Sequence, residues 1–295
     1  IVILLGMVVL LMLRGRRDAR AHSSTKPATA AEPEPTDAEL EAVGLSREDI
    51  KRYEKGAECS FWFVKADKIR DWHGAPPGSL QTLRKDRSDW LEREVIRFVD
   101  GYRGKYRERI LVVSHRWETP EAPDDKGDQW AAIRKHVIED TRIELVWFDF
   151  WCMPQGKSKT AVEKREFATM LPNINLLYLT ATVLILLDDS YIGRFWTQFE
   201  AYLSMRTLTQ EGLGSLQDDR HARHKIVKLH NATEKTAEHL VEMWANKTPD
   251  EAHETLRSPD VTVTNQGDKD TQLKKLEKLD QNIRSMVDKL TEVEV

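Results

Sequence analysis

Three apolar runs in the middle of the chain each end in a cluster of polar and aromatic side chains. The runs begin at Ile110, Leu145 and Val183, and each has aliphatic or aromatic residues at successive positions. A short run of this kind predicts a strand buried on both faces, as in a parallel sheet covered by helices. Ligands bind beyond the carboxyl ends of such strands. We therefore expect the three clusters to converge on one cleft.

Helical patterns separate these runs and follow the last of them. Pro172 predicts a kink or a break in the second of the helices. Strands that alternate with helices indicate right-handed crossovers and a parallel sheet. The predicted elements are helices over residues 127–140, 160–179, 195–209 and 232–244, and a fourth strand over residues 225–230.

The region before the first run predicts helices. Thr36 and Glu39 have the spacing of a capping box, and residues 80–99 show an amphipathic helical pattern. We therefore interpret residues 37–106 as a helical N-terminal extension. It would pack on an α/β domain that covers residues 107–245.

Residues 1–17 predict a truncated transmembrane anchor. The first 13 residues are apolar apart from Gly6, and three arginines follow Leu13. A full span takes about 20 residues, so part of the segment would lie upstream; a signal-peptide core is the alternative. The arginines would place the folded domain in the cytosol, anchored to a membrane. Residues 18–36 are rich in Ala, Pro, Ser and Thr and predict a disordered linker.

The C-terminal part predicts a second linker and a coiled coil. Residues 246–270 are polar and predict a loose linker, whereas residues 271–295 carry apolar residues at heptad spacing. Such a seam predicts a homo-oligomer, formed through the domain or through these heptads. The alternative is a helix laid on the domain surface. The two seam positions hold Leu276, Ile283 and Leu290, and Leu279, Met286 and Val293.

Composition excludes several classes of protein. A net charge of -4 over 295 residues gives no electrostatic case for binding nucleic acid. Cys59 and Cys152 are the two cysteines, which argues against a secreted disulfide scaffold and for a reducing compartment. No glycine-rich phosphate loop of the Rossmann or P-loop type occurs. His221 and His224 are too isolated for a zinc site, so no metal is expected.

Short motifs lie at the strand ends and in the helices of the central region. They are Ser114-x-x-Trp117, Trp147-x-Asp149-x-x-Cys152-x-x-Gln155, Glu163 with Met170, and Arg194-x-Trp196-Thr197-x-x-Glu200. In this order they resemble the fungal heterokaryon-incompatibility (HET) domain, a family related to TIR domains. Ser114-His115-Arg116-x-Glu118 also resembles the opening of plant TIR domains, and Trp196-x-x-x-Glu200 resembles the spacing of their third helix.

The resemblance implies a flavodoxin-like, TIR-type fold and a role in stress, self-recognition or cell-death signalling. In enzymatic TIR domains the third-helix glutamate acts in cleaving NAD at the nicotinamide ribosyl bond, and by position that residue is Glu200. A nearby carboxylate can stabilise the oxocarbenium character of such a reaction. NAD would be the substrate, and no cofactor is expected. The residues expected to contact the nucleotide are Ser114, His115, Arg116, Trp117, Asp149, Trp151, Arg194 and Trp196.

Individual roles follow from the chemistry of these side chains. The tryptophans would stack on nicotinamide or adenine, and Arg116 or Arg194 would meet the pyrophosphate. Alternatives stay open at this point. Glu200 could be a solvated helix residue or an ion-pair partner, and Cys152 fits a buried small hydrophobe better than a nucleophile. The domain as a whole could be a non-enzymatic, self-associating signalling adaptor, or a domain that only senses a nucleotide.

Overall fold

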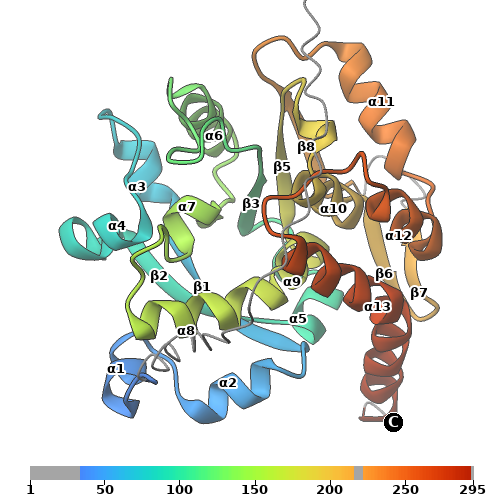
Figure 1. Cartoon of the computed structure of the whole chain (residues 1–295), viewed down its shortest axis with the longest axis horizontal. Coiled ribbons are helices and arrows are strands. Elements are labelled where there is room, and N and C mark those ends of the chain that lie inside the picture. The colour runs from blue at the N-terminus through green and yellow to red at the C-terminus, as the bar shows by residue number, and fades with distance from the viewer. Residues whose placement is uncertain (1–33, 216–221, 294–295) are drawn as a thin grey trace, which may run out of the picture. The chain divides into compact units, whose positions relative to one another are not determined.

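A central sheet with helices around it forms the core of the protein. The computed structural model describes residues 34–215 and 222–293 (Figure 1). Among these residues, six strands pair in the order β2-β1-β4-β3-β5-β8. Only β1 runs against its sheet neighbours, so this sheet is mostly parallel. The strands are β1 (Glu58–Lys65), β2 (Leu91–Arg97), β3 (Ile110–Ser114), β4 (Leu145–Trp147), β5 (Thr182–Leu187) and β8 (His224–Lys228).

The strand order confirms the predicted α/β class. From β3 the chain moves outward to β4, returns past β3 to β5, and continues to β8. This 2-1-3-4 order is the one found in flavodoxin-like sheets, whose ligand site lies where the order reverses. Here that point is between β3 and β5, where Ser114 pairs with Ile185.

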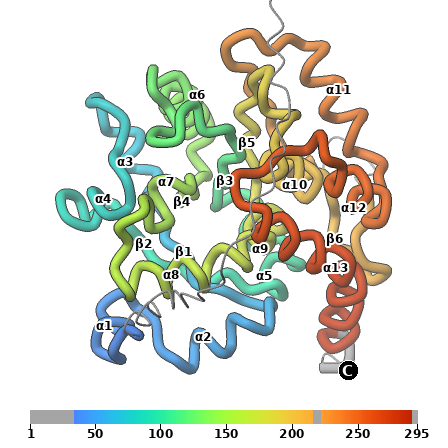
Figure 2. The backbone as a smooth tube through the Cα atoms, viewed as in Figure 1, coloured from blue at the N-terminus to red at the C-terminus, as the bar shows by residue number. Residues whose placement is uncertain are grey.

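Helices fill the connections between the parallel strands (Figure 2). Pro172 lies in a short 3-10 turn (Leu171–Asn173) that separates α8 from α9, as predicted. The helix predicted over 195–209 ends early, because Arg206–Thr209 and Gly212–Ser215 form a hairpin of β6 and β7. The helices are α6 (Asp128–Glu139), α7 (Asp149–Cys152), α8 (Ala161–Met170), α9 (Asn175–Thr180), α10 (Phe195–Ser204) and α11 (Glu234–Trp244).

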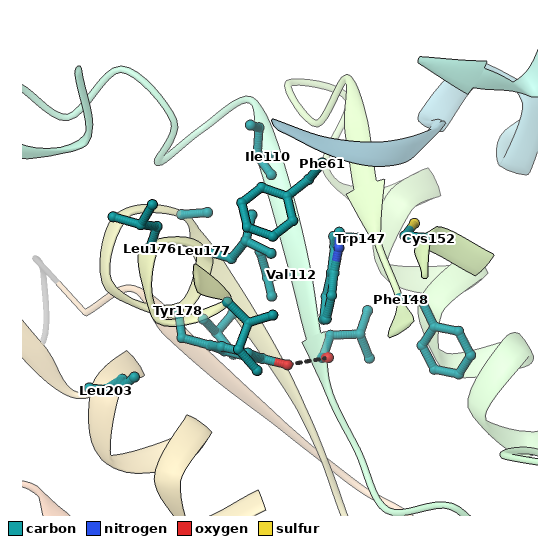
Figure 3. Packing of buried hydrophobic residues seen from close by; sticks show 14 of the residues in the cluster. Phe61, Ile110, Val112, Trp147, Phe148, Cys152, Leu176, Leu177, Tyr178 and Leu203 are labelled. Atoms are coloured by element: carbon teal, nitrogen blue, oxygen red, sulfur yellow. Dashed lines mark hydrogen bonds between the residues drawn. The ribbon is translucent and has the colours of Figure 1, made fainter. Parts of the chain in front are cut away.

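The core is built around β3, whose five residues are all buried. Figure 3 shows Phe61 of β1, Trp147 of β4 and Tyr178 of α9 packed around Val112. The Tyr178 hydroxyl donates a hydrogen bond of 3.3 Å to the carbonyl of Val113. The four successive apolar side chains from Ile110 to Val113 are stable here because protein covers both faces of the strand.

The prediction of a helical extension over residues 37–106 is wrong in its middle part. β1 and β2 pair along their length in antiparallel register, and β1 also pairs with β4, so this region extends the main sheet. The amphipathic pattern over 80–99 breaks at a 3-10 turn, and β2 follows, since pairing with β1 overrides the local helical pattern. The helical elements here are α1 (Asp37–Ala42), α2 (Arg47–Tyr53), α3 (Ala66–Asp71), α4 (Leu80–Asp86), η1 (Ser88–Trp90) and α5 (Phe98–Tyr102).

A buried carboxylate ties this N-terminal region to the rest of the domain. Glu166 of α8 is fully buried and accepts a 2.6 Å hydrogen bond from the Trp62 indole of β1. It also accepts hydrogen bonds of 2.7 and 2.8 Å from Arg84 of α4, and Arg93 of β2 lies 3.3 Å from it. A buried charge is tolerated only when it is paired and hydrogen-bonded. These contacts therefore fix four elements relative to one another.

The C-terminal region also differs from the prediction. α12 (Pro249–Arg257) lies within the predicted loose linker 246–270, and Thr248 caps it together with Glu251. α13 (Gln266–Val293) begins before the predicted coiled coil at residue 271. Leu276 and Ile283, which share one heptad position, are buried against the domain. The structure therefore shows a helix packed on its own domain, which was the alternative to a coiled-coil seam.

The predicted membrane anchor receives a correction. Its segment, residues 1–17, and the linker up to residue 33 lie outside the described residues. Across residues 34–215 and 222–293, no helix combines the length and the apolar character that a bilayer crossing requires. This finding contradicts the predicted membrane-anchored localisation, which we do not retain.

Candidate functional site

A cavity of about 500 Å³ lies at the carboxyl edge of the parallel strands. Its walls come from the segments after β3 and β4, from α9 and α10, and from the segment before α13. This is the edge of the sheet at which the strand order reverses. The structure thus brings the strand-end clusters together. The expected residues that line this cavity are His115, Arg116, Trp117, Asp149, Arg194, Trp196 and Glu200.

Glu200 lies on the wall formed by α10 and is held by the end of β3. Ser114 Oγ donates a hydrogen bond of 2.6 Å to Glu200 Oε2. The Tyr191 hydroxyl, which follows β5, lies 2.5 Å from the same Ser114 Oγ. Ser114 and Tyr191 are themselves buried, so their hydroxyl groups cannot turn to bulk water. The carboxyl group of Glu200 is therefore oriented by the two central strands of the sheet.

The protonation of Glu200 is unusual for a glutamate. The pKa of Glu200 is raised from 4.5 to about 8, chiefly by burial; the Ser114 hydrogen bond acts to lower it, and the charge of Asp149 acts to raise it. The hydroxyl group of Tyr178, which also lines the cavity, acts to lower it. Around neutral pH the empty cavity therefore holds mostly the protonated acid. A group with such a pKa can donate a proton, or can release one when a positive charge comes close.

The pKa of a second carboxyl group in the cavity, that of Asp149, is shifted in the opposite direction. Asp149 Oδ1 lies 2.9 Å from His115 Nε2, and Asp149 Oδ2 accepts a 2.8 Å hydrogen bond from the Trp117 indole. Burial alone would raise the pKa of Asp149, but the charge and hydrogen bond of His115 outweigh it and hold the pKa below its usual value. The cavity thus combines one ionised and one protonated carboxyl group, a pairing that enzymes use to assign base and acid roles.

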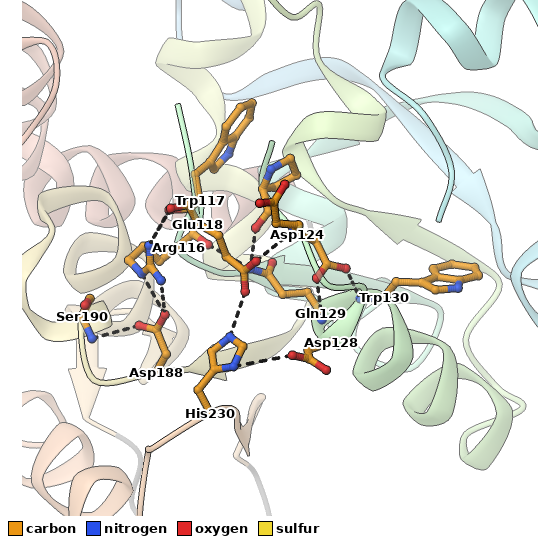
Figure 4. Close-up of polar contacts among 12 residues, drawn as sticks. Arg116, Trp117, Glu118, Asp124, Asp128, Gln129, Trp130, Asp188, Ser190 and His230 are labelled. Carbon is orange, nitrogen blue, oxygen red and sulfur yellow. Dashed lines mark hydrogen bonds and ion pairs between the residues drawn. The ribbon is translucent and has the colours of Figure 1, made fainter. Parts of the chain in front are cut away.

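Arg116 is engaged in an ion pair within the protein. Its guanidinium group lies 2.6 Å from Asp188, just after β5, and donates 2.7 Å to the carbonyl of Trp117. Figure 4 shows this pair beside a contact of 2.8 Å between Glu118 and His230. These contacts fasten the segment after β3 to the segments after β5 and β8. Arg116 is consequently better suited to shaping the cavity wall than to binding a free pyrophosphate.

The mouth of the cavity carries an exposed cation. Arg194 is exposed just before α10, and Trp196 is half-buried one turn before Glu200 on that helix. The segment before α13 closes one side, because the amide of Thr262 donates 3.0 Å to the carbonyl of Gly193. Asp268, in the first turn of α13, also lines the cavity. Sequence reasoning missed it because the segment looked like a loose linker, with no pattern to tie it to α10.

Trp151 does not line the cavity, unlike the other expected aromatic residues. Its ring is buried and packs against Phe148 and Trp130, at centroid distances of 4.4 and 5.7 Å. Sequence reasoning passed over Tyr178 and Tyr191. Tyr178 lines the cavity, and the Tyr191 hydroxyl lies 2.5 Å from Ser114 Oγ. Their signal was weak because each looked like an ordinary apolar position in a helix or a turn.

Within the ranges that the structure describes, no group of three His, Cys, Asp or Glu side chains could hold a metal ion.

Comparisons with known proteins add no assignment. No protein-family model, no curated protein and no solved structure matches the chain. The HET and TIR labels drawn from the motifs, and the NAD-hydrolase label with them, therefore have no family match behind them. What the site can do has to be argued from its own chemistry.

Proposed function

We propose that the cavity binds NAD or a related nucleotide, and that Glu200 assists cleavage of the bond between nicotinamide and ribose. The observation that supports this is the Ser114–Glu200 hydrogen bond of 2.6 Å in an aromatic-walled cavity at the reversal point of the sheet. Parallel α/β sheets bind nucleotides at this point. The motif resemblance to HET and TIR domains, and the TIR-type character of the fold, belong to the same proposal.

The cavity offers groups for each part of such a ligand. The indole rings of Trp117 and Trp196 can cover an aromatic base or the nicotinamide ring. Arg194 at the mouth can pair with the pyrophosphate, since an arginine fork matches phosphate oxygens. Cleavage places positive charge on the ribose, and an ionised Glu200 would stabilise it. The nicotinamide ring is itself cationic and would favour ionisation of Glu200 as it enters.

Release of nicotinamide tests the proposal. Purified full chain at high concentration is incubated with NAD, and nicotinamide is measured by chromatography. We expect Glu200→Gln to reduce the rate by at least about 100-fold, since it keeps the shape of the side chain and removes its charge. Trp151→Phe serves as the matched control, because this aromatic residue lies outside the cavity. Equal rates for the wild type and Glu200→Gln, or no nicotinamide from the wild type, would refute cleavage by this site.

A second candidate is a nucleotide sensor without cleavage. The raised pKa of Glu200, about 8, favours it, because a neutral carboxyl group can hold an amide by hydrogen bonds but cannot stabilise a cation. Titration calorimetry with NAD separates the two functions. Binding without nicotinamide release supports the sensor, and loss of that binding in Arg194→Ala would place the nucleotide in this cavity.

A further inference from the structure

The buried side chain of Arg223 connects two helices of the candidate site at their C-terminal ends. Arg223 begins the chain segment that leads into β8, and its side chain is 3% exposed. Nη1 donates hydrogen bonds of 3.0 and 2.8 Å to the carbonyls of Tyr178 and Ala181, at the end of α9. Nη2 donates 3.1 Å to the carbonyl of Leu203, in the last turn of α10, and 2.7 Å to that of Arg206, the first residue of β6.

The last carbonyls of a helix have no partner within the helix and carry partial negative charge. A buried cation placed between two such helix ends is stabilised by both of them. The arginine fork is planar and rigid, and it can donate in two directions at once, which a lysine ammonium group on a flexible stem cannot reproduce. Arg223 therefore sets the separation of α9 and α10 at their C-terminal ends.

Both helices carry a residue of the site. α9 carries Tyr178 and α10 carries Glu200, and both residues line the cavity, where Tyr178 acts to lower the pKa of Glu200. The two helices pack against each other beside β5 (Figures 1 and 2). Leu203, whose carbonyl Arg223 binds, lies one turn after Glu200 on the same helix.

We propose that Arg223 is a positioning residue of this site, which holds Tyr178 against Glu200 by joining the ends of α9 and α10. This inference rests on the proposed function, because it takes Glu200 as the group that meets the ligand. Arg223 acts through the backbone of the two helices and does not contact the cavity itself. Replacing it loosens the floor of the cavity and admits water to Glu200.

Arg206 provides a matched control with the same chemistry. It is 1% exposed, and its guanidinium group donates 2.7 Å to the carbonyl of Trp244 and 2.8 Å to that of Lys247, at the end of α11. It also binds the carbonyl of Ala245. Arg206→Lys therefore disturbs a buried arginine and a helix end, as Arg223→Lys does, but leaves the ends of α9 and α10 joined.

The experiment follows the titration of Glu200 in the full chain. The infrared band of its protonated carboxyl group is identified by its loss in Glu200→Gln, and the midpoint of its pH dependence is measured. We expect Arg223→Lys to lower the midpoint by about one unit, because burial is the main cause of the raised value and water now reaches the group. Arg206→Lys should leave the midpoint unchanged, although thermal unfolding should show that both variants are less stable.

Further measurements test the role of Arg223 independently of the proposed function. Tyr178→Phe should raise the midpoint, because it removes a hydroxyl group that acts to lower the pKa of Glu200. An unchanged midpoint in Tyr178→Phe would overturn the inference even if Arg223→Lys did not fold. A folded Arg223→Lys with the wild-type midpoint, or an equal shift in Arg206→Lys, would also overturn it. If NAD is not cleaved by the wild type, these titrations still decide the role of Arg223. If it is cleaved, Arg223→Lys should reduce kcat more than it changes KM.

Discussion

The Glu200 carboxyl group makes the stability of the fold depend on pH. Burial raises its pKa from the ordinary value of 4.5 to about 8, so between these values the folded chain holds a proton that the unfolded chain has released. Stability from this group is therefore complete below pH 4.5 and is lost as the pH rises through 8. A difference of roughly 3.5 pKa units corresponds to about 5 kcal/mol in the free energy of unfolding. Access of water through the cavity makes this an upper bound.

Urea unfolding of the wild type and of Glu200→Gln between about pH 5 and pH 9 measures this loss. We expect the wild type to lose up to about 1.4 kcal/mol per pH unit relative to the variant, because glutamine has the same shape and does not titrate. Asp149→Asn is the comparison: it keeps Glu200, so its stability should still fall with pH, over a range moved to lower pH because the charge of Asp149 no longer raises the pKa of Glu200. The pKa of Asp149 is held low, so its contribution is lost only as the pH falls below this range. Parallel stability curves for the wild type and Glu200→Gln would refute the reasoning.

Three further predictions concern packing and ligand binding. Glu166→Ala should lower the free energy of unfolding by about 3 kcal/mol in urea, because it leaves two half-buried guanidinium groups without their carboxylate. Ile283→Ala should lower the free energy of unfolding by about 2–5 kcal/mol and Leu290→Ala by much less, since only Ile283 is fully buried on the domain. Equal losses of stability, together with a changed mass in sedimentation, would indicate an intermolecular seam instead. NAD binding near pH 7 should release about one proton from Glu200, measured by calorimetry in buffers of different ionisation enthalpy, whereas ADP-ribose, which lacks the cationic ring, should release none.

The parallel part of the sheet could be predicted from sequence because its signal is local. β3 and β5 are buried along nearly their whole length, and their residues are apolar apart from Ser114 at the end of β3 and Thr182 at the start of β5. Strand ends follow from the first polar residue after each run, and this placed Ser114 and Asp149 at the edge of the sheet. Pro172 marked the division of the second helix for an equally local reason, since proline cannot donate the main-chain hydrogen bond that a continuous helix requires.

The antiparallel edge of the sheet could not be predicted in this way. In β2, Val95 is half-buried and Ile96 is buried, and the strand also carries charged residues that pair across the sheet or with α8. Arg93 illustrates the difficulty: it reads as an exposed helix position, yet it donates 2.7 Å to Ser60 and lies beside the buried Glu166. Its partners lie tens of residues away in the sequence, and no local sequence pattern indicates them.

The site itself shows the same division between local and distant causes. Sequence spacing put Glu200 on a helix after the third apolar run, but its chemistry depends on Ser114, which lies 86 residues earlier, and on Tyr178 and Tyr191. These groups bury the carboxyl group, and burial keeps it protonated while the cavity is empty. A ligand that brings a fixed positive charge would ionise Glu200 on arrival, whereas a neutral or anionic ligand would leave it protonated. Under the proposed function, the charge of the ligand therefore decides whether this residue acts as a hydrogen-bonding acid or as the carboxylate that N-ribosyl cleavage requires.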